Sequence, residues 1–472
     1  MIRNLYIYIL IALIVSSCGI PKEYSHRNIQ VQEFYKVDSA VQVEGKKNVN
    51  LNRKTFIKDT VLNNIIDSVL VNNYRVLIAI KTVEKFEQSV KQSKAANIPE
   101  LNFQVNAERD NFSDNSLNGK QGFNLENSLG QNYVEDYIAG LTLNWQPDIW
   151  LKNKNRKKAA IALWFKENEI LKKLKLDLVK NTILTYYEIA AINQKLEIAN
   201  SNLAFGDSIL KVVKVKKEFG DASELDVQQA QLQRLVIERS IFAFKDSLSI
   251  NYNLMKLLLG NPDAHLQVVA ELEDFKFEKN LTLGTPKDLL KTNPNVKKEG
   301  YGFEENLSML KIANANRYPN INLGVAAGFN SFNSGNWLVA PSSIFSSAIG
   351  SFVQPIFNRR KLKTDYNIAK INLEQSSLKI NKELLNTTIE VSNKTNTYAS
   401  LNLIIENNKE QVELLQDALK NANLLYKEGI TDYLQVLIVQ QQKLAVEINL
   451  LDVRKAMIEA YINIYTSMGY TL

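Results

Sequence analysis

The stretch "FVQPIFNRRKLK", residues 352–363, changes character abruptly at a proline. An apolar segment leads to Pro355 and two bulky apolar residues, and four basic residues then follow within five positions. The stretch "LNWQPDIWLKNKNRKK", residues 143–158, has the same order of apolar segment, Gln-Pro, bulky aromatic residue and basic cluster. So specific an order, present twice, indicates that the chain contains an internal repeat.

The repeat extends well beyond these two stretches. Each copy has a proline followed by two widely spaced glycines: Pro147, Gly220 and Gly260 in the first copy, Pro355, Gly429 and Gly469 in the second. The two glycine pairs share one offset between the copies, 209 (429 minus 220 and 469 minus 260). Upstream, "NIPELNF" at 97–103 resembles "RYPNINL" at 317–323 with a larger offset, so the copies differ in length in the loops between.

Two very long helical hairpins are predicted after the prolines. From Ile192 to Val213 apolar and small residues recur at 4-3 spacing, and the pattern returns in the second copy at the same offset, with one asparagine in it. This spacing is typical of a coiled-coil seam. Only Gly206 interrupts the first tract, which would be roughly 100 Å long as a helix. Since the glycines at the ends are typical of turns, we expect hairpins at 152–259 and 359–468.

Four shorter segments alternate between apolar and polar residues. Alternation over eight to ten residues, weaker in the fourth segment, predicts two strand pairs: 100–109 with 136–147, and 320–331 with 344–355. Helices are expected before each pair, at about 61–96 and 296–316. Each repeat is therefore helix, strand, loop, strand, proline, very long helix, glycine turn and return helix.

The N-terminus has the features of an exported protein. Arg3 precedes an apolar run that is too short to cross a bilayer as a helix, and Ser16-Ser17 follow it, as in a signal peptide. Cys18, the single cysteine, resembles the lipid-bearing cysteine of bacterial lipoproteins, with a free thiol as the alternative, and Gly19 after it favours the outer membrane. The expected boundaries are a signal peptide at 1–17, a lipid-anchored extended tether at 18–60, repeat 1 at 61–260, a connector with a possible β element at 261–285 and repeat 2 at 286–472.

The composition argues against several kinds of function. The formal net charge of +7 is modest for 472 residues, and both signs are plentiful, so charge does not indicate nucleic-acid binding. The two histidines, His26 and His265, and the lone cysteine do not make a nucleophilic or zinc site by the usual ligands. There is no P-loop. We expect no enzyme, no metal and no cofactor.

The predicted strands favour a membrane location. Segments of about ten residues with one apolar face match the roughly 9–11 residues of a tilted membrane strand, and aromatic residues cluster near their ends. A four-stranded soluble sheet with one buried face would show the same alternation. If the strands span, four cannot close a barrel by themselves, so the chain must associate with further copies. Closure alone permits two, three or four copies.

The chain resembles the TolC-like outer-membrane efflux proteins, in particular the NodT-like lipoprotein branch. The resemblance covers nearly everything after Cys18 and is carried by paired stretches at 67–101 and 288–329 and by two hairpin tips, "FGDASELDVQQAQ" and "EGITDYLQVLIVQQQ". It implies a mainly α fold with membrane β structure: long coiled-coil hairpins and four transmembrane strands per chain, with a homotrimer forming a 12-stranded β-barrel continuous with a 12-helix α-barrel.

The resemblance also implies a function and partners. The protein would be an outer-membrane channel, the exit duct of a tripartite efflux or secretion system, passively conducting small molecules. Its partners would be a periplasmic adaptor, an inner-membrane pump of the RND or ABC type, and outer-membrane lipid. A periplasmic adaptor or structural coiled-coil lipoprotein is the alternative, but adaptors carry one hairpin per chain where this chain has two.

Two groups of candidate functional residues follow. The tip and gate group contains Gly220, Asp226, Gly429, Asp432 and Gln435. Three copies of Asp226 could form an acidic ring at the entrance, or Asp226 could favour a helix start; Asp432 is expected to be a cap. The barrel–tunnel junction group contains Pro147, Trp150, Arg156, Lys157, Lys158, Pro355, Phe357, Arg359, Arg360 and Lys361. Cations at a helix start oppose its dipole, so anionic lipid head groups are the expected partners of the basic cluster.

Overall fold

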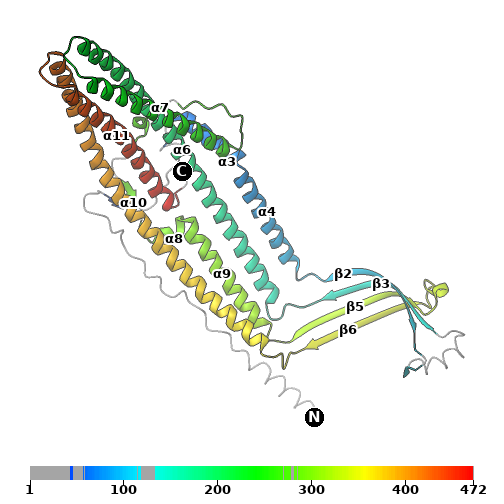
Figure 1. Cartoon of the computed structure of the whole chain (residues 1–472). Helices are drawn as coiled ribbons and strands as arrows, with labels where there is room; N and C mark the ends of the chain where they lie inside the picture. The colour runs from blue at the N-terminus through cyan, green and yellow to red at the C-terminus, as the bar shows by residue number, and fades with distance from the viewer. Residues whose placement is uncertain are drawn as a thin grey trace.

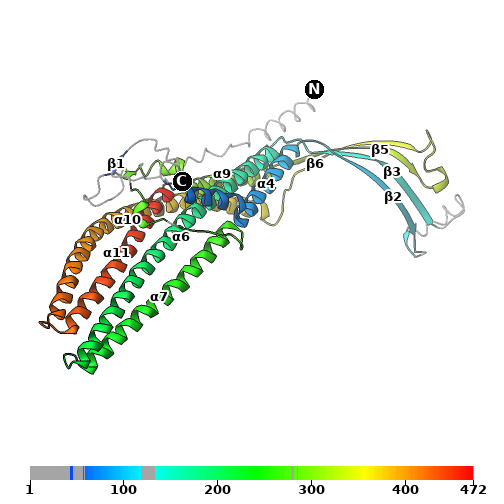
Figure 2. The same cartoon turned by 90° about the horizontal axis from the view of Figure 1, so that it is seen from above.

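The computed structural model describes residues 43–45, 57, 59–113, 115–117, 133–268, 270–277, 281–283 and 285–470. The predicted signal peptide and lipid site, most of the tether and most of the loop at 111–132 lie outside the described residues. The described chain is elongated, with two long helical hairpins at one end and a curved sheet at the other (Figure 1). The same chain seen from above shows the hairpins and the sheet extending in opposite directions from a central helical layer (Figure 2).

The internal duplication and the two long hairpins are confirmed. The ascending helices α6 (Lys152–Glu218) and α10 (Lys361–Lys427) each have 67 residues. The return helices are α7 (Glu224–Leu259) and α11 (Tyr433–Ser467). The chain reverses at Gly220 and Gly429, whose φ angles of 84° and 75° lie in the left-handed region that glycine tolerates best.

The first leading helix is not continuous, contrary to expectation. Residues 61–96 fold as α3 (Thr60–Asn72) and α4 (Tyr74–Ala95), and Asn73 stands between them in an extended conformation. The Asn73 side chain accepts a hydrogen bond from the backbone N–H of Arg75, so it ends one helix and caps the next. The second repeat has the same break between α8 (Leu289–Thr292) and α9 (Pro294–Ala315).

The four strands form one antiparallel sheet in the order β2-β3-β5-β6. They are β2 (Glu100–Asn111), β3 (Tyr133–Trp145), β5 (Asn320–Ser331) and β6 (Ile344–Val353). The register aligns Phe103 with Leu141 and Leu141 with Ala327, so the apolar residues share one face. The strands expected at 136–147 and 344–355 end two residues early, because Pro147 and Pro355 have no N–H to give to a ladder.

Part of the predicted tether is built into the fold. Residues Val43–Gly45 form β1, which pairs in parallel with β4 (Leu281–Leu283) of the connector. The described part of the connector also contains a 3-10 turn, η1 (Leu272–Asp274), and another, η2 (Ser334–Asn336), lies between β5 and β6. Residues 43–45 of the segment expected to be extended are thus paired, as a strand, with the connector.

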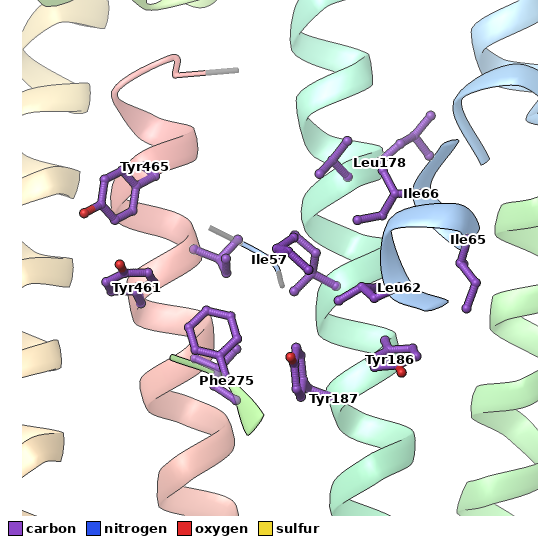
Figure 3. Close-up of a cluster of buried hydrophobic side chains, with 14 of the residues drawn as sticks. Ile57, Leu62, Ile65, Ile66, Leu178, Tyr186, Tyr187, Phe275, Tyr461 and Tyr465 are labelled. Atoms are coloured by element: carbon purple, nitrogen blue, oxygen red, sulfur yellow. The ribbon is translucent and has the colours of Figure 1, made fainter. Parts of the chain in front are cut away.

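The main core lies where the short helices meet the middle of the long ones. Side chains of α3 and α6, among them Leu62, Ile66 and Leu178, face aromatic rings of the connector and of α11 (Figure 3). Phe275 is central, with its ring edge-on to both Tyr187 and Tyr461 at centroid distances of 5.4 and 5.6 Å. Edge-to-face pairs add to the hydrophobic stabilisation of such a cluster. This core packs helices of both hairpins, α6 and α11, against each other through the connector.

Candidate functional site

The junction between β3 and α6 in repeat 1 packs against residues of repeat 2. The indole Nε1 of Trp150 donates to the carbonyl oxygen of Pro319 over 2.7 Å, and its ring stacks on Tyr318 at a centroid distance of 4.8 Å. Pro147 and Trp150 line a small pocket together with Pro319. The predicted junction residues Pro147 and Trp150 are therefore packed against the end of α9 and the start of β5.

An acidic residue that sequence reasoning did not single out caps α6. Both carboxylate oxygens of Asp148 accept backbone hydrogen bonds of 2.8 Å, from the N–H groups of Asn153 and Lys154. Leu151 before the helix is left-handed and makes no side-chain cap. Burial and the nearby Arg156 lower the pKa of Lys152, and Asp148 opposes this change. The carboxylate thus offsets the unfavourable position of cations at a helix start.

The basic residues of repeat 1 differ in their surroundings, and Lys152 lines the junction pocket. Arg156 donates to the Asn153 side chain over 3.0 Å. Arg156, Lys157 and Lys158 are all exposed, so their charges remain available to a partner outside the chain.

The junction of repeat 2 differs from that of repeat 1. Phe357 is 86% exposed and Ile356 is 96% exposed, so Phe357 does not share the packed environment of Trp150. Arg359 and Arg360 lie before α10 with positive φ angles of 52° and 68°, and the helix has no side-chain cap. The helix expected from residue 359 therefore begins at Lys361. Its first turn contains cations and no acidic residue.

At the first hairpin tip, Asp226 is part of a capping box. Its Oδ2 accepts hydrogen bonds from the backbone N–H and the hydroxyl of Ser223, over 2.8 and 2.7 Å, and Ser223 Oγ accepts from the Asp226 N–H. Such reciprocal caps stabilise the start of a helix. In a single chain, Asp226 therefore has the helix-start role that the sequence analysis named as one of its two interpretations.

The second tip lacks the corresponding side-chain bond. Asp432 occupies the N-cap position of α11, but its side chain makes no capping hydrogen bond. Gln435 lies in the first turn of the same helix, where its backbone N–H donates to the Asp432 carbonyl oxygen over 3.2 Å. Asp432 thus occupies the N-cap position that was expected, but it does not make the capping hydrogen bond.

The two tips are joined by contacts that sequence reasoning missed. The Lys216 ammonium donates to the carbonyl oxygen of Tyr426 over 2.7 Å and lies 4.5 Å from the centre of its ring. The Tyr426 ring lies beside that of Tyr433, which is 3% exposed. Burial, with smaller contributions from Tyr426 and Asp226, raises the pKa of Tyr433 to about 12. No sequence motif marks these residues, because the pairing depends on how the hairpins lie together.

Polar pairs continue the link between the hairpins away from the tips. Lys195 of α6 makes an ion pair of 2.7 Å with Asp452 of α11, and the Gln441 side chain donates to that of Gln233 over 2.8 Å. Among the described residues, no group of three or more His, Cys, Asp or Glu side chains is arranged to hold a metal ion. In the same part of the chain, no helix combines the length and apolar character that a membrane-spanning helix needs.

Comparison with known proteins identifies relatives over the whole length. The family model described as "Outer membrane efflux protein" matches residues 65–261 and 285–470. The cation efflux system protein CusC of Escherichia coli (strain K12) is 24% identical over 465 residues, covering 97% of each chain. The toluene efflux pump outer membrane protein TtgF of Pseudomonas putida is 21% identical, covering 98% of this chain and 96% of TtgF.

A further relative and a solved structure are also similar to this chain over most of its length. The probable outer membrane lipoprotein SilC of Salmonella typhimurium is 24% identical, covering 88% of this chain and 87% of SilC. A crystal structure of CusC superimposes with a TM-score of 0.83 at 22% identity, covering 96% of this chain and all of the other. The fold is therefore that of a known channel.

Proposed function

The chain belongs to the outer membrane efflux protein family, and from this premise we propose that it is the exit duct of a three-part efflux system. In this role the protein conducts small molecules passively from the periplasm to the outside. An inner-membrane pump supplies the energy, and a periplasmic adaptor connects the pump to this chain.

The observation that carries the proposal is the open sheet at the end of a helical layer. The four strands are 10 to 13 residues long, enough to cross the hydrocarbon core at a tilt. The outer edges of β2 and β6 are the two ends of the strand order. Open edges in lipid leave backbone groups without hydrogen bonds. Three copies would supply a closed barrel of 12 strands, and the hairpins of the same copies a tunnel below it.

The hairpin tips are the proposed contact with the adaptor. They lie at the far end of the molecule from the sheet (Figure 1), and they expose the apolar residues Phe219 and Ile430 beside the two turn glycines. In a trimer, three copies of Asp226 would surround the entrance. Because each Asp226 already accepts two hydrogen bonds, we expect its ring to contribute a modest preference for cations.

The membrane-facing ends carry the proposed lipid contacts. Cys18 would hold the lipid anchor. The exposed cations after Pro147 and Pro355 would bind anionic head groups on the periplasmic side, each with about 1 kcal/mol of favourable energy near a charged surface.

The cargo is proposed only as a class. The names of two relatives refer to cations and to toluene, so relatives of similar identity handle unlike compounds. A wide duct contacts its solutes weakly, and we therefore assign the choice of cargo to the partner pump.

Three measurements test the function. Deletion of the gene should sensitise cells to toxic compounds in a panel that includes divalent cations and toluene, and the pump and adaptor should co-purify with the tagged protein. The purified protein should form conducting pores in planar bilayers. A protein that stays monomeric in mild detergent and gives no conductance would rule the proposal out.

A further inference from the structure

The loop between β5 and β6, residues 332–343, is uncharged and folded back on itself. Its sequence, FNSGNWLVAPSS, contains no Asp, Glu, Lys, Arg or His. At its base the Asn330 N–H donates to the Ser343 carbonyl oxygen over 2.8 Å, and the Ser343 N–H donates to the Val339 carbonyl oxygen over 2.9 Å. The Ser343 hydroxyl donates to the Asn336 carbonyl oxygen over 2.5 Å. Because these polar groups are bonded to one another, the loop can lie in apolar surroundings at a low cost.

Trp337 places this loop on the apolar face of the sheet. Its ring lies 5.3 Å from the ring of Tyr137 on β3, measured between centroids. Tyr137 and Leu141 are four positions apart on β3, so they are on the same face. That face also carries Phe103, which is registered with Leu141. Since β5 lies between β3 and β6 in the sheet, Trp337 reaches across β5 on the apolar side.

The contact between Trp337 and Tyr137 lies at the outer boundary of the apolar face, far from the helices (Figure 1). Trp145 marks the helical end of β3, eight residues from Tyr137 (145 minus 137). This separation is roughly 26 Å along a strand and roughly 20 Å across a membrane at a tilt of about 40°. Two residues beyond Tyr137, Glu135 makes an ion pair with Arg109 on the same face, so charges begin there. The Trp337–Tyr137 pair therefore lies where the outer aromatic girdle of a membrane barrel belongs.

The loop exposes apolar side chains at this boundary. Leu338 and Val339 directly follow Trp337 and are 66% and 45% exposed. Ile344 begins β6 opposite Phe329, on the apolar face, and is also exposed. The apolar surface thus continues from the strand into the loop with no charged residue between them.

We propose that this loop is an interfacial anchor, which inserts Leu338 and Val339 among the acyl chains of the outer leaflet. Trp337 would lie at the level of the head groups, where its ring is favoured. The occupant of this surface is lipid, because the surface is uncharged and continuous with the face that would contact lipid. The proposal rests on the proposed function, since it requires strands that span the membrane. It also means that this loop lies on the lipid side of the barrel wall and does not cover the exit.

Quenching of a fluorescent label by lipid tests the anchor. The variants Leu338→Cys, Phe103→Cys and Asn106→Cys are labelled with a small environment-sensitive fluorophore and reconstituted in vesicles whose acyl chains carry a nitroxide. Wild-type protein, treated in the same way, gives the background from Cys18. Leu338→Cys should be quenched about as strongly as Phe103→Cys on the apolar face of the sheet.

Asn106 provides the matched control. It is registered with Ile138, the neighbour of Tyr137, and therefore lies close to the depth of the loop contact but on the polar face. Asn106→Cys should be quenched several-fold less than Leu338→Cys.

Removal of the aromatic contact gives an independent readout. In the Leu338→Cys protein, Trp337→Ala should abolish most of the quenching, because alanine cannot hold the loop against the ring of Tyr137. Trp337→Phe should retain most of it.

The possible outcomes separate this proposal from the proposed function. If Phe103→Cys is quenched but Leu338→Cys behaves like Asn106→Cys, or if Trp337→Ala changes nothing, the loop is not an anchor while the membrane channel stands. If Leu338→Cys is shielded from the lipid quencher and from a water-soluble quencher alike, protein covers the loop and the proposal is also wrong. If Phe103→Cys itself is not quenched, the strands do not span the bilayer and the proposed function fails.

Discussion

Asn73 donates from its Nδ2 to the carbonyl oxygen of Leu258 over 2.8 Å, and its counterpart in the second repeat, Asn293, makes the same bond to Ser467 over 2.6 Å. Each asparagine is buried and also caps the helix that follows it. One side chain in each repeat thus connects the start of the helix that leads to the sheet with the end of a return helix. The bond fixes the base of each hairpin to the layer that leads to the sheet.

The first prediction concerns this tie. Asn73→Ala should lower the free energy of unfolding by about 1–3 kcal/mol, because the Leu258 carbonyl oxygen loses its donor in a buried place and α4 loses its cap. Thermal unfolding followed by circular dichroism measures the effect. Asn72→Ala, at an exposed neighbour, is the control and should change little; equal loss in both variants would contradict the assigned role.

The second prediction separates the glycines at the hairpin bases from those at the tips. A Cβ on Gly469 would come within 2.3 Å of the Thr292 carbonyl oxygen, whereas a Cβ on Gly429 would meet nothing within 4 Å, although both residues have positive φ. Gly429→Ala should therefore cost only the conformational strain, about 1–2 kcal/mol. Gly469→Ala should cost more and reduce the folded yield, as should Gly260→Ala. Expression level and melting temperature in parallel would show whether the two classes differ.

The third prediction concerns high pH at the tips. Burial favours the neutral phenol of Tyr433 and raises its pKa from 10.0 to about 12. The stabilisation from this neutral group is therefore complete below pH 10 and is lost as the pH rises from 10 to 12. We expect limited proteolysis at the tips to increase over this interval. In Tyr433→Phe the increase should be smaller, because the buried ring can no longer ionise; an unchanged profile would contradict the prediction.

The fourth prediction concerns the basic cluster at the start of α10. Replacing Arg359, Arg360, Lys361 and Lys363 with Gln should reduce membrane insertion or the yield of assembled protein. The variant lacks the four positive charges that would attract this end of α10 to anionic head groups. Binding to vesicles with and without an anionic lipid provides the direct measurement. A matched variant with Gln at four exposed lysines of the hairpins, Lys211, Lys214, Lys420 and Lys427, serves as control. An unchanged yield for the cluster variant would remove the lipid role.

The two Gln-Pro stretches, at 143–158 and 352–363, show which features could be predicted from the sequence. The two Gln-Pro boundaries mark the ends of β3 and β6, and the helices after them begin at Lys152 and Lys361. The order of elements in each repeat was predictable because strand and helix periods differ and because proline and glycine punctuate them. The local break at Asn73 was not predicted, since asparagine inside an apolar-periodic tract can equally remain helical.

The junction residues show where prediction from sequence stopped. Trp150 and Phe357 looked alike in sequence, but Trp150 is bonded to Pro319 in the second repeat, whereas Phe357 is exposed at the edge of the chain. Asp148 lies in the quoted stretch, and its position shortly before a predicted helix could have suggested a cap. The contact of Lys216 with Tyr426 had no such signal, because the two residues lie on different hairpins, far apart in the sequence.

The sequence by itself therefore determined the duplication, the type and order of the elements and their approximate ends, because these depend on periodicity and on the backbone limits of proline and glycine. Only the tertiary structure decided which copy of each element is covered. Corresponding strands of the two repeats have different neighbours, since β3 and β5 lie between two strands of their own chain, whereas their counterparts β6 and β2 are the two edges of the sheet. This difference in neighbours cannot be read from the sequence of any one helix or strand. It leaves the edges of this chain available to further copies.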